Sequence, residues 1–564
     1  MIGRAAGNSI TLEIANEPLL PGPQGSRVQV IDYDGSTRAL YEPVDLDDPA
    51  VLMNDGLTPT ESDPRFHQQM VYAVAMKVLE NFESALGRPL MFHRNKRLKI
   101  YPHAFKGANA FYDPDLTALL FGYFTADEED PGPNLPGQTV FACLSHDIIA
   151  HEMTHALVHR LRPHFIDAAN PDVFAFHEGF SDIVAIFQHF SFQNVLAETI
   201  QKTRGDLRSP TTLVELAQQF GYATGSGAAL RTALDTGGKP DPQLYRTALE
   251  PHDRGSILVA AVFDAFFSAY QHRIKDLIRI ATGGTGRLPE GDLHPDLVNR
   301  IAKEASKSAQ NVLTMCMRAF EYLPPVDVDY GDFLRAIVTA DYEMVPEDGV
   351  GLRSALIEAF RVRGVYPTGV ISLAEDSLLW PDRESEGLVL PFAPFKEALV
   401  NNAKAFDRWG RRVPDTPDTR GAMDKWAVLL GKFAAEHAAV LGLDPAAERK
   451  PKLDGFHTVF RFSPKGQLVV ELVAQFTQED LRARDDPAFG GVPVRGGTTI
   501  IANAEGKVRY IISKPLEDER RTRQRDFVEA SDRSDAILAW CDDGYEPKRM
   551  RLRTSFAALH RRLL

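Results

Sequence analysis

The sequence is poor in cysteine and lacks a long apolar run. Its three cysteines, Cys143, Cys316 and Cys541, are odd in number and far apart. This spacing excludes a disulfide framework and is typical of buried thiols in a reducing compartment. No apolar stretch reaches the roughly 18 residues of a membrane-spanning helix, and residues 1–25 show no signal-peptide pattern. We therefore expect a cytoplasmic protein that does not cross a membrane.

The sequence also has fewer basic residues than acidic ones. The chain has 63 Lys and Arg against 77 Asp and Glu, which gives a formal net charge of −14. This balance argues against nucleic acid as the main partner and against an anionic membrane surface. The 44% apolar and 25% charged residues are ordinary for a globular protein. A chain of 564 residues is long enough for roughly two to four domains.

The most informative stretch contains an HExxH motif. His151 and His155 are four residues apart, so on a helix they share one face, where two imidazoles can bind one zinc ion. Glu152 can then reach the zinc-bound water as general base. A catalytic zinc needs a third protein ligand, and Glu178 is placed to supply it from a second helix. Asp182 can accept the free ring N–H of His151 and fix its tautomer.

An HExxH motif alone is weak evidence, because the same pattern arises by chance on solvated helices. Here apolar residues flank the motif, and a second motif supplies a carboxylate ligand together with a further acid. A metzincin site is excluded, because it needs Gly and His where this chain has Val158 and Leu161. We therefore expect one zinc ion per chain, held by His151, His155 and Glu178.

Hydrophobic patterning predicts an α+β protein with several parts. Residues 1–25 are expected to form an irregular arm, residues 26–150 a β-rich lobe, and residues 151–366 a helical lobe that carries the zinc site. A Pro-rich connector and a separate small α+β domain are expected over residues 367–564. A β-rich half followed by a helical half predicts a two-lobed body with a cleft.

The expected elements follow from periodicity and from Gly and Pro breaks. Helices are predicted over residues 66–86, 195–203, 213–220, 256–280, 297–320, 333–341, 352–361, 422–441 and 554–564. Strands are predicted over residues 27–33, 98–101, 456–462, 468–476, 498–503 and 507–513, with two extended segments between residues 106 and 124.

In this order, the motifs resemble the thermolysin family of zinc metallopeptidases, the glutamate zincins, over about residues 27–366. The stretch from Asp147 to Ala156 is similar to that family's metal-binding helix, and the stretch from Glu178 to Asp182 to its third-ligand motif. The stretch that begins with Asn109 and Ala110 resembles the family's edge strand. The resemblance implies that these two residues hold the backbone of the substrate.

Two further residues resemble the family's substrate-binding and catalytic groups. Arg231 resembles the arginine that binds a substrate carbonyl, and His252 resembles the histidine that stabilises the tetrahedral intermediate. The acid that orients this histidine is not at its usual place, but Glu250 and Asp253 are close in sequence. The resemblance implies a thermolysin-like, two-lobed endopeptidase that acts on a peptide or protein, with Glu152 as general base.

The sequence departs from the family at two places. Ala169 stands where the family has its oxyanion tyrosine, and Tyr245 is a candidate replacement. Asp147 matches one calcium ligand, but residues 187–190 replace the acidic cluster of the double calcium site. The resemblance therefore supports zinc and does not support calcium.

Two other classes of function fit the same motifs. One is a catalytically retired zinc-binding protein that binds a protein partner through residues 367–564. The other is a zinc hydrolase that acts on a non-peptide substrate. The intact general base Glu152 argues against the first class, and no feature of the sequence excludes the second.

Overall fold

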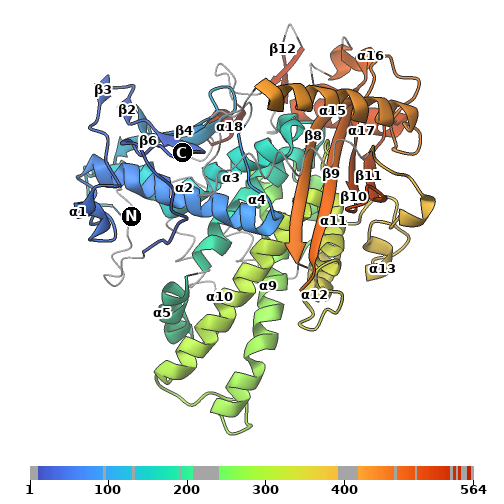
Figure 1. Ribbon diagram of the computed structural model, residues 1–564. Coiled ribbons are helices and arrows are strands. Elements are labelled where there is room, and N and C mark those ends of the chain that lie inside the picture. The colour runs from blue at the N-terminus through green and yellow to red at the C-terminus, as the bar shows by residue number, and fades with distance from the viewer. Residues whose placement is uncertain are drawn as a thin grey trace.

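The computed structural model describes most of the chain (Figure 1). The described residues are 11–92, 97–129, 134–190, 192–207, 240–391, 417–462, 466–484, 486–489, 492–533, 538–541, 544–547 and 555–560. The helix predicted over residues 213–220 and the predicted substrate-binding Arg231 lie outside these ranges. The fold is a mixed α+β structure, as the sequence predicted.

A five-stranded sheet forms the first part of the molecule. Four strands follow one another in the order β1, β4, β6 and β5, and β7 also pairs with β6. β5 ends this path, so it is an edge strand, as predicted. The strands are β1 (Val28–Val30), β4 (Leu98–Lys106), β5 (Ala110–Asp113), β6 (Ala118–Thr125) and β7 (Thr139–Phe141). A small antiparallel pair, β2 (Tyr33–Asp34) and β3 (Ala39–Leu40), lies beside them.

Helix α2 (Pro64–Leu86) packs against β1 and β4 of this sheet. It begins at Asp63, whose side chain accepts the backbone N–H of Arg65. It ends at Gly87, which has a left-handed conformation with φ of 66°. The helix predicted over residues 66–86, with this glycine as its end, is therefore confirmed.

Two helices in the centre of the molecule carry the predicted zinc motifs. They are α3 (His146–Leu161) and α4 (Pro171–Phe190), which pack against each other. Every residue from Asp147 to Val158 is buried, as the apolar flanks of the motif predicted. The surrounding helices are α5 (Gln193–Thr203), α8 (Pro242–Thr247), α9 (Pro251–Ala281), α10 (Pro295–Arg318), α11 (Tyr330–Tyr342), α12 (Leu352–Val362) and α13 (Glu375–Leu378).

A second, antiparallel sheet has the strand order β11, β10, β9, β8. These are the four strands that the alternating pattern predicted after residue 450. Their bounds are β8 (Lys452–Phe462), β9 (Leu468–Glu479), β10 (Arg495–Ala502) and β11 (Val508–Lys514). The remaining elements of this part are α15 (Pro417–Glu436), α16 (Leu481–Arg484), α17 (Asp518–Arg533), β12 (Leu538–Cys541), β13 (Gly544–Pro547) and α18 (Ser555–His560).

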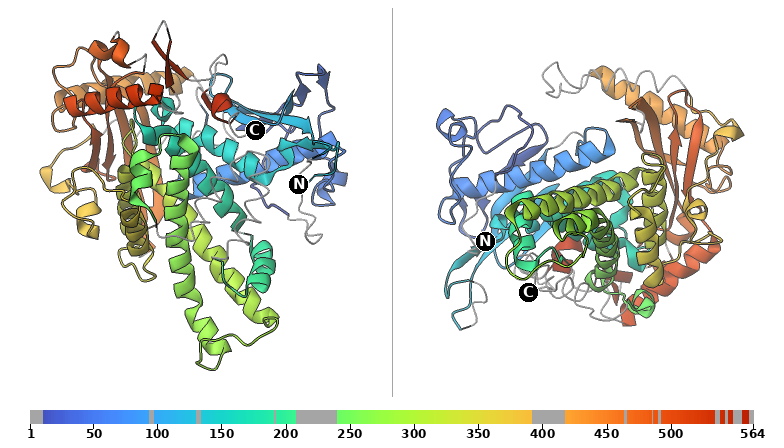
Figure 2. Two further views of the ribbon diagram at one scale, coloured as in Figure 1. Left: turned by 180° about the vertical axis from the view of Figure 1, so that it is seen from behind. Right: turned by 90° about the horizontal axis from the view of Figure 1, so that it is seen from below.

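The second sheet is covered on both faces. Along β9, Leu472 and Ala474 belong to a core shared with Leu430 of α15, whereas Val473 belongs to the main core of the molecule. This alternation puts α15 on one face and the central helices on the other. The two sheets therefore stand on opposite sides of α3 and α4 (Figure 2).

The hydrophobic core continues across the boundary predicted near residue 366. Glu321 links residues on both sides of this boundary. It is only 3% exposed and accepts a hydrogen bond of 2.8 Å from Nε of Arg88. The other carboxylate oxygen of Glu321 lies 2.8 Å from Nε2 of His457 in β8. Burial raises the pKa of Glu321, but the charge of Arg88 lowers it further than burial raises it, to well below its ordinary range.

Among the described residues, none of the helices combines the length and the apolar character that crossing a membrane requires.

We expect the Glu321→Ala variant to lose about 3–5 kcal/mol of unfolding free energy, because it leaves the buried Arg88 guanidinium without its partner. Chemical denaturation measures this loss. Glu358→Ala is the matched control, since it removes only an exposed ion pair with Arg361 and should leave the unfolding free energy nearly unchanged. Equal losses in both variants would contradict the structural role of Glu321.

Candidate metal centre

The two histidines of the HExxH motif face one another on α3. Their Nε2 atoms are 2.9 Å apart, and the side chains of His151 and His155 are 4% and 0% exposed. This geometry follows from the helix, in which residues four apart share a face. The sequence prediction that both imidazoles point to one place is confirmed.

Glu178 of α4 brings its carboxylate to the same place. One oxygen lies 3.3 Å from Nε2 of His151, and the other lies 3.6 Å from Nε2 of His155. Both oxygens are buried and have no hydrogen-bond partner among the described residues. A buried carboxylate without such partners is costly, and a cation between these side chains would remove that cost.

A fourth side chain joins this group. His560 of α18 places Nε2 3.5 Å from Oε2 of Glu178. The ligand atoms of His151, His155, Glu178 and His560 all lie within 4.8 Å of one another, and all four residues are buried. The structure thus shows a buried group of histidine and glutamate side chains that is able to hold a metal ion. The sequence analysis did not predict His560, since no local motif marks it.

Further polar groups orient the imidazoles. Nδ1 of His151 lies 2.9 Å from the carboxylate of Asp182, the residue predicted for this contact. A proton held there leaves Nε2 free to bind a metal ion. Nδ1 of His155 lies 3.2 Å from both Oγ of Ser181 and Nδ1 of His177. All these orienting side chains lie on α4, one helix turn or less from Glu178.

Glu152 lies between the centre and the edge strand. Its Oε2 accepts the backbone N–H of Tyr112 in β5 at 2.9 Å, and its Oε1 is 3.2 Å from Nδ1 of His560. Ala110 begins the same strand, and Asn109 immediately precedes it. The structure therefore brings the predicted base and the two predicted substrate-binding residues to one edge of the first sheet.

His252 approaches the centre from the first turn of α9. Its Nε2 is 3.5 Å from Oε2 of Glu178 and has no hydrogen-bond partner among the described residues. Its Nδ1 is 2.9 Å from Glu250, which also caps α9 by accepting the N–H groups of His252 and Asp253. Glu250 is thus the acid that orients this histidine, and Asp253 is not.

Two glycines allow this approach of α9 to α4. A Cβ atom on Gly179 would lie 2.7 Å from the carbonyl oxygen of Gly255. Such a contact is too close for any residue but glycine. Gly179 follows Glu178 directly and Gly255 lies one turn after His252, so the crossing sets the distance between these two functional side chains.

Tyr245 does not face the centre. Its hydroxyl donates a hydrogen bond of 2.7 Å to Asp172, and its ring stacks on Tyr330 with centroids 5.5 Å apart. Arg254 also binds Asp172 and lies over the Tyr245 ring, so the tyrosine is fixed in this network. The prediction that Tyr245 replaces the missing oxyanion tyrosine is therefore wrong.

The acids of the centre favour positive charge at His151, whereas burial lowers the pKa of His155. Burial lowers the pKa of His151, but its hydrogen bond to Asp182 and the nearby Glu178 carboxylate raise that pKa to about 9. Burial raises the pKa of Glu178, but the positive charges of His155 and His560 hold it well below its ordinary range. Surroundings that stabilise a proton on an imidazole also stabilise a cation bound by it.

A second buried group also contains two histidines and a cysteine: His67, His103 and Cys143. Nδ1 of His103 is 2.7 Å from Asp32, and its Nε2 is 2.8 Å from Nδ1 of His67. This hydrogen-bonded chain accounts for the close approach of the imidazoles. Burial raises the pKa of the Cys143 thiol well above its ordinary range, which disfavours the thiolate that a metal ion requires.

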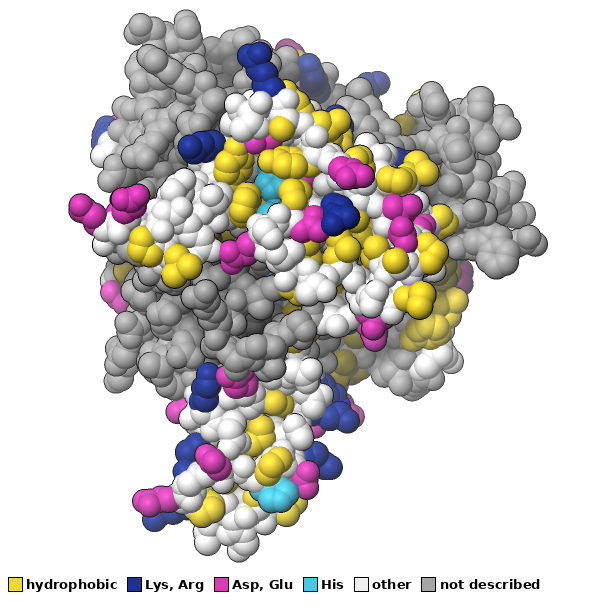
Figure 3. Space-filling view, turned by 90° about the vertical axis from the view of Figure 1, so that its left-hand side faces the viewer, with side chains coloured by type: hydrophobic (Ala, Val, Ile, Leu, Met, Phe, Trp, Pro, Cys, Tyr) yellow, Lys and Arg dark blue, Asp and Glu magenta, His cyan; other side chains and the backbone are white. Residues whose placement is uncertain are grey.

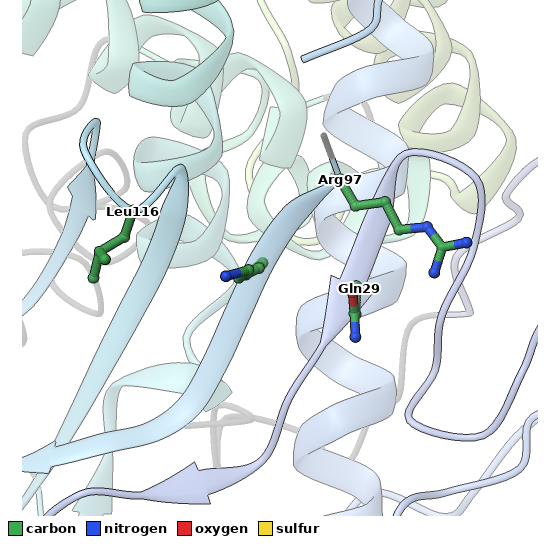
Figure 4. Close-up of a pocket in the computed structure, with 4 residues that line it drawn as sticks. Gln29, Arg97 and Leu116 are labelled. Atoms are coloured by element: carbon green, nitrogen blue, oxygen red, sulfur yellow. The ribbon is translucent and has the colours of Figure 1, made fainter. Parts of the chain in front are cut away.

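An open pocket lies on the outer face of the first sheet (Figure 4). It is lined by Gln29, Arg97, Lys99 and Leu116. Lys99 points to this face because its neighbours Leu98 and Ile100 in β4 are buried against the core. The pocket contains none of the residues of the metal-binding group. On the face shown in Figure 3, hydrophobic side chains lie around a histidine.

Comparison of the sequence with models of known protein families gives no match, and comparison with curated proteins gives none either. Function is therefore inferred from the chemistry of the site.

We expect the purified protein to contain about one zinc ion per chain and the Glu178→Ala variant to bind zinc at least about 10-fold more weakly, because the carboxylate lies against both imidazoles of α3. Elemental analysis and competition with a chelator measure this. Glu358→Ala, on the exposed face of α12, should bind zinc as the unaltered protein does. Unchanged zinc affinity in Glu178→Ala would remove Glu178 from the ligand set.

We expect Gly179→Ala to lower the unfolding free energy by about 1–3 kcal/mol and to weaken zinc binding, because the added methyl group pushes α9 away from α4. Thermal unfolding and chelator competition measure the two effects. Gly349→Ala is the control, since a Cβ atom there meets nothing within 4 Å. A Gly179→Ala protein as stable as the control variant would show that the crossing tolerates a side chain.

Proposed function

We propose that the protein is a zinc-dependent hydrolase of peptide bonds. One observation carries the proposal: Glu152, the predicted general base, lies between a buried His and Glu group that can hold a metal ion and a sheet edge that no other described strand pairs with. The donor set of imidazole nitrogens and one carboxylate suits zinc. Zinc bound there supplies a Lewis acid that acidifies a water molecule and polarises a carbonyl group.

The residues around the centre have separate tasks in this proposal. His151, His155 and Glu178 hold the ion, and Asp182 fixes the tautomer of His151. Glu152 accepts a proton from the attacking water and passes it to the leaving amine. The N–H of Tyr112 keeps one carboxylate oxygen of Glu152 in place, so that the other oxygen is directed to the reacting atoms.

His252 is the proposed donor to the developing oxyanion. Its Nδ1 is held by Glu250, and its Nε2, which has no hydrogen-bond partner among the described residues, points toward Glu178. Such a positioned donor stabilises negative charge that develops in the transition state. Tyr245 does not share this task, because its hydroxyl donates a hydrogen bond to Asp172.

The edge strand β5 supports an extended peptide as substrate. Its outer edge is not paired with another strand of the described chain, so the backbone of Ala110 can pair with a peptide as an added strand, next to the side chain of Asn109. The order and contacts of these groups also support a thermolysin-like, two-lobed arrangement over about residues 27–366. A non-peptide substrate would have no use for this edge, and a retired site would have no use for Glu152.

We expect the Glu152→Gln variant to keep its fold and its zinc but to hydrolyse peptides about 10²–10⁴-fold more slowly, because only the proton acceptor is lost. A peptide mixture analysed by mass spectrometry, with zinc content measured in parallel, tests this. Turnover near that of the unaltered protein would exclude Glu152 as the base. Turnover of other electrophiles, with no peptide cleaved, would favour a non-peptide hydrolase.

A further inference from the structure

His560 has no task in the hydrolysis proposed above, yet it is buried at the centre. It is 6% exposed and comes from α18, whereas the other members of the group come from α3 and α4. Its Nε2 is buried and has no hydrogen-bond partner among the described residues. A buried imidazole nitrogen without a partner is costly, so its position requires an explanation.

The other ring nitrogen of His560 explains the orientation of the imidazole. Nδ1 lies 2.8 Å from the backbone carbonyl oxygen of Ala110, which can only accept a hydrogen bond. The proton must therefore be on Nδ1, and Nε2 directs its lone pair toward Glu178, 3.5 Å away. This is the arrangement of a metal-binding histidine, in which one nitrogen donates to a carbonyl group and the other binds the ion.

We propose that His560 is a fourth protein ligand of the metal ion and that α18 thereby holds the centre in a self-closed state. The proposal rests on the metal site of the proposed function but not on its hydrolytic activity. A zinc ion with four protein ligands has no open position, whereas a catalytic zinc ion needs one for water or substrate. The described conformation is then a latent one, and α18 must leave the centre before a peptide can be cleaved.

A second observation supports this assignment independently of the metal ion. The Ala110 carbonyl that binds His560 belongs to the edge strand proposed to pair with the substrate backbone. Phe556, one turn earlier in α18, packs its ring on His155, with centroids 4.5 Å apart, and on Tyr112, with centroids 6.1 Å apart. Thus α18 occupies the edge strand and the metal centre at the same time, as a bound peptide would.

Nδ1 of His560 is also 3.2 Å from Oε1 of Glu152. In the closed state, this oxygen of the base faces an imidazole instead of a water molecule. One short helix therefore engages the three groups on which hydrolysis depends: the ion-binding side chains, the base and the substrate edge. We infer that α18 acts as an intramolecular competitor of the substrate.

The test uses cobalt(II) in place of zinc in the full chain, because its visible spectrum reports the number and type of ligands. Azide and imidazole serve as small probes of an open position. In the unaltered protein, we expect a four-coordinate spectrum that neither probe changes. In His560→Ala, we expect a shifted spectrum, a further change when imidazole fills the vacated place, and cobalt affinity lower by at least about 10-fold. His272→Ala, on the exposed part of α9, is the matched control and should behave as the unaltered protein does.

Peptide hydrolysis is measured on the same proteins. We expect His560→Ala and Phe556→Ala to cleave a short peptide at least about 10-fold faster than the unaltered protein, because each loosens α18. If His560→Ala does not fold, His560→Gln takes its place, since its amide keeps much of the side-chain volume but not the imidazole.

The outcomes separate this proposal from the proposed function. An unaltered protein whose cobalt spectrum responds to azide as His560→Ala does would overturn the closed state, as would identical spectra of the two proteins. A failure of all variants to bind cobalt would overturn the metal site and the fourth ligand together. Spectra as expected, with no peptide cleaved by any variant, would leave His560 as a ligand and contradict the peptidase.

Discussion

Buried negative charge is the constraint on which the centre of this molecule depends. Glu152 and Glu178 are each 1% exposed, and Glu178 has no hydrogen-bond donor among the described residues. Desolvated carboxylates are stable only where positive charge is close. Glu152 lies on α3 and Glu178 on α4, and α3, α9 and α18 each bring an imidazole to these acids. A metal ion held by those imidazoles would complete the balance of charge that the protein side chains begin.

The backbone makes this concentration of charge possible. The glycine contact between α4 and α9 lets His252 come within 3.5 Å of Glu178. The second sheet packs on the same core, and Glu321 ties it to the first half of the chain through Arg88 and His457. Residues after 366 therefore pack against the core that surrounds the centre, and they also contain α18.

Sequence patterns predicted what local spacing controls. The helical period placed His151 and His155 on one face, and strand alternation predicted the four strands of the second sheet. Contacts between distant segments were not predictable in this way. Glu250 was only one of two acids near His252, and Tyr245 was a candidate for the centre although Asp172, on another helix, holds it elsewhere. His560 carries no motif, because its role depends on where the fold brings α18.

The contact between His560 and Ala110 joins residues 450 positions apart in the sequence. Closing so long a loop costs conformational entropy, which packing repays only after both ends are in place. His151, His155 and Glu178, by contrast, come from neighbouring segments and can assemble early. Synthesis from the N-terminus would therefore produce the open centre before the helix that closes it. On the arrangement proposed for α18, latency is a property that the chain gains late in folding, after the capacity to bind metal.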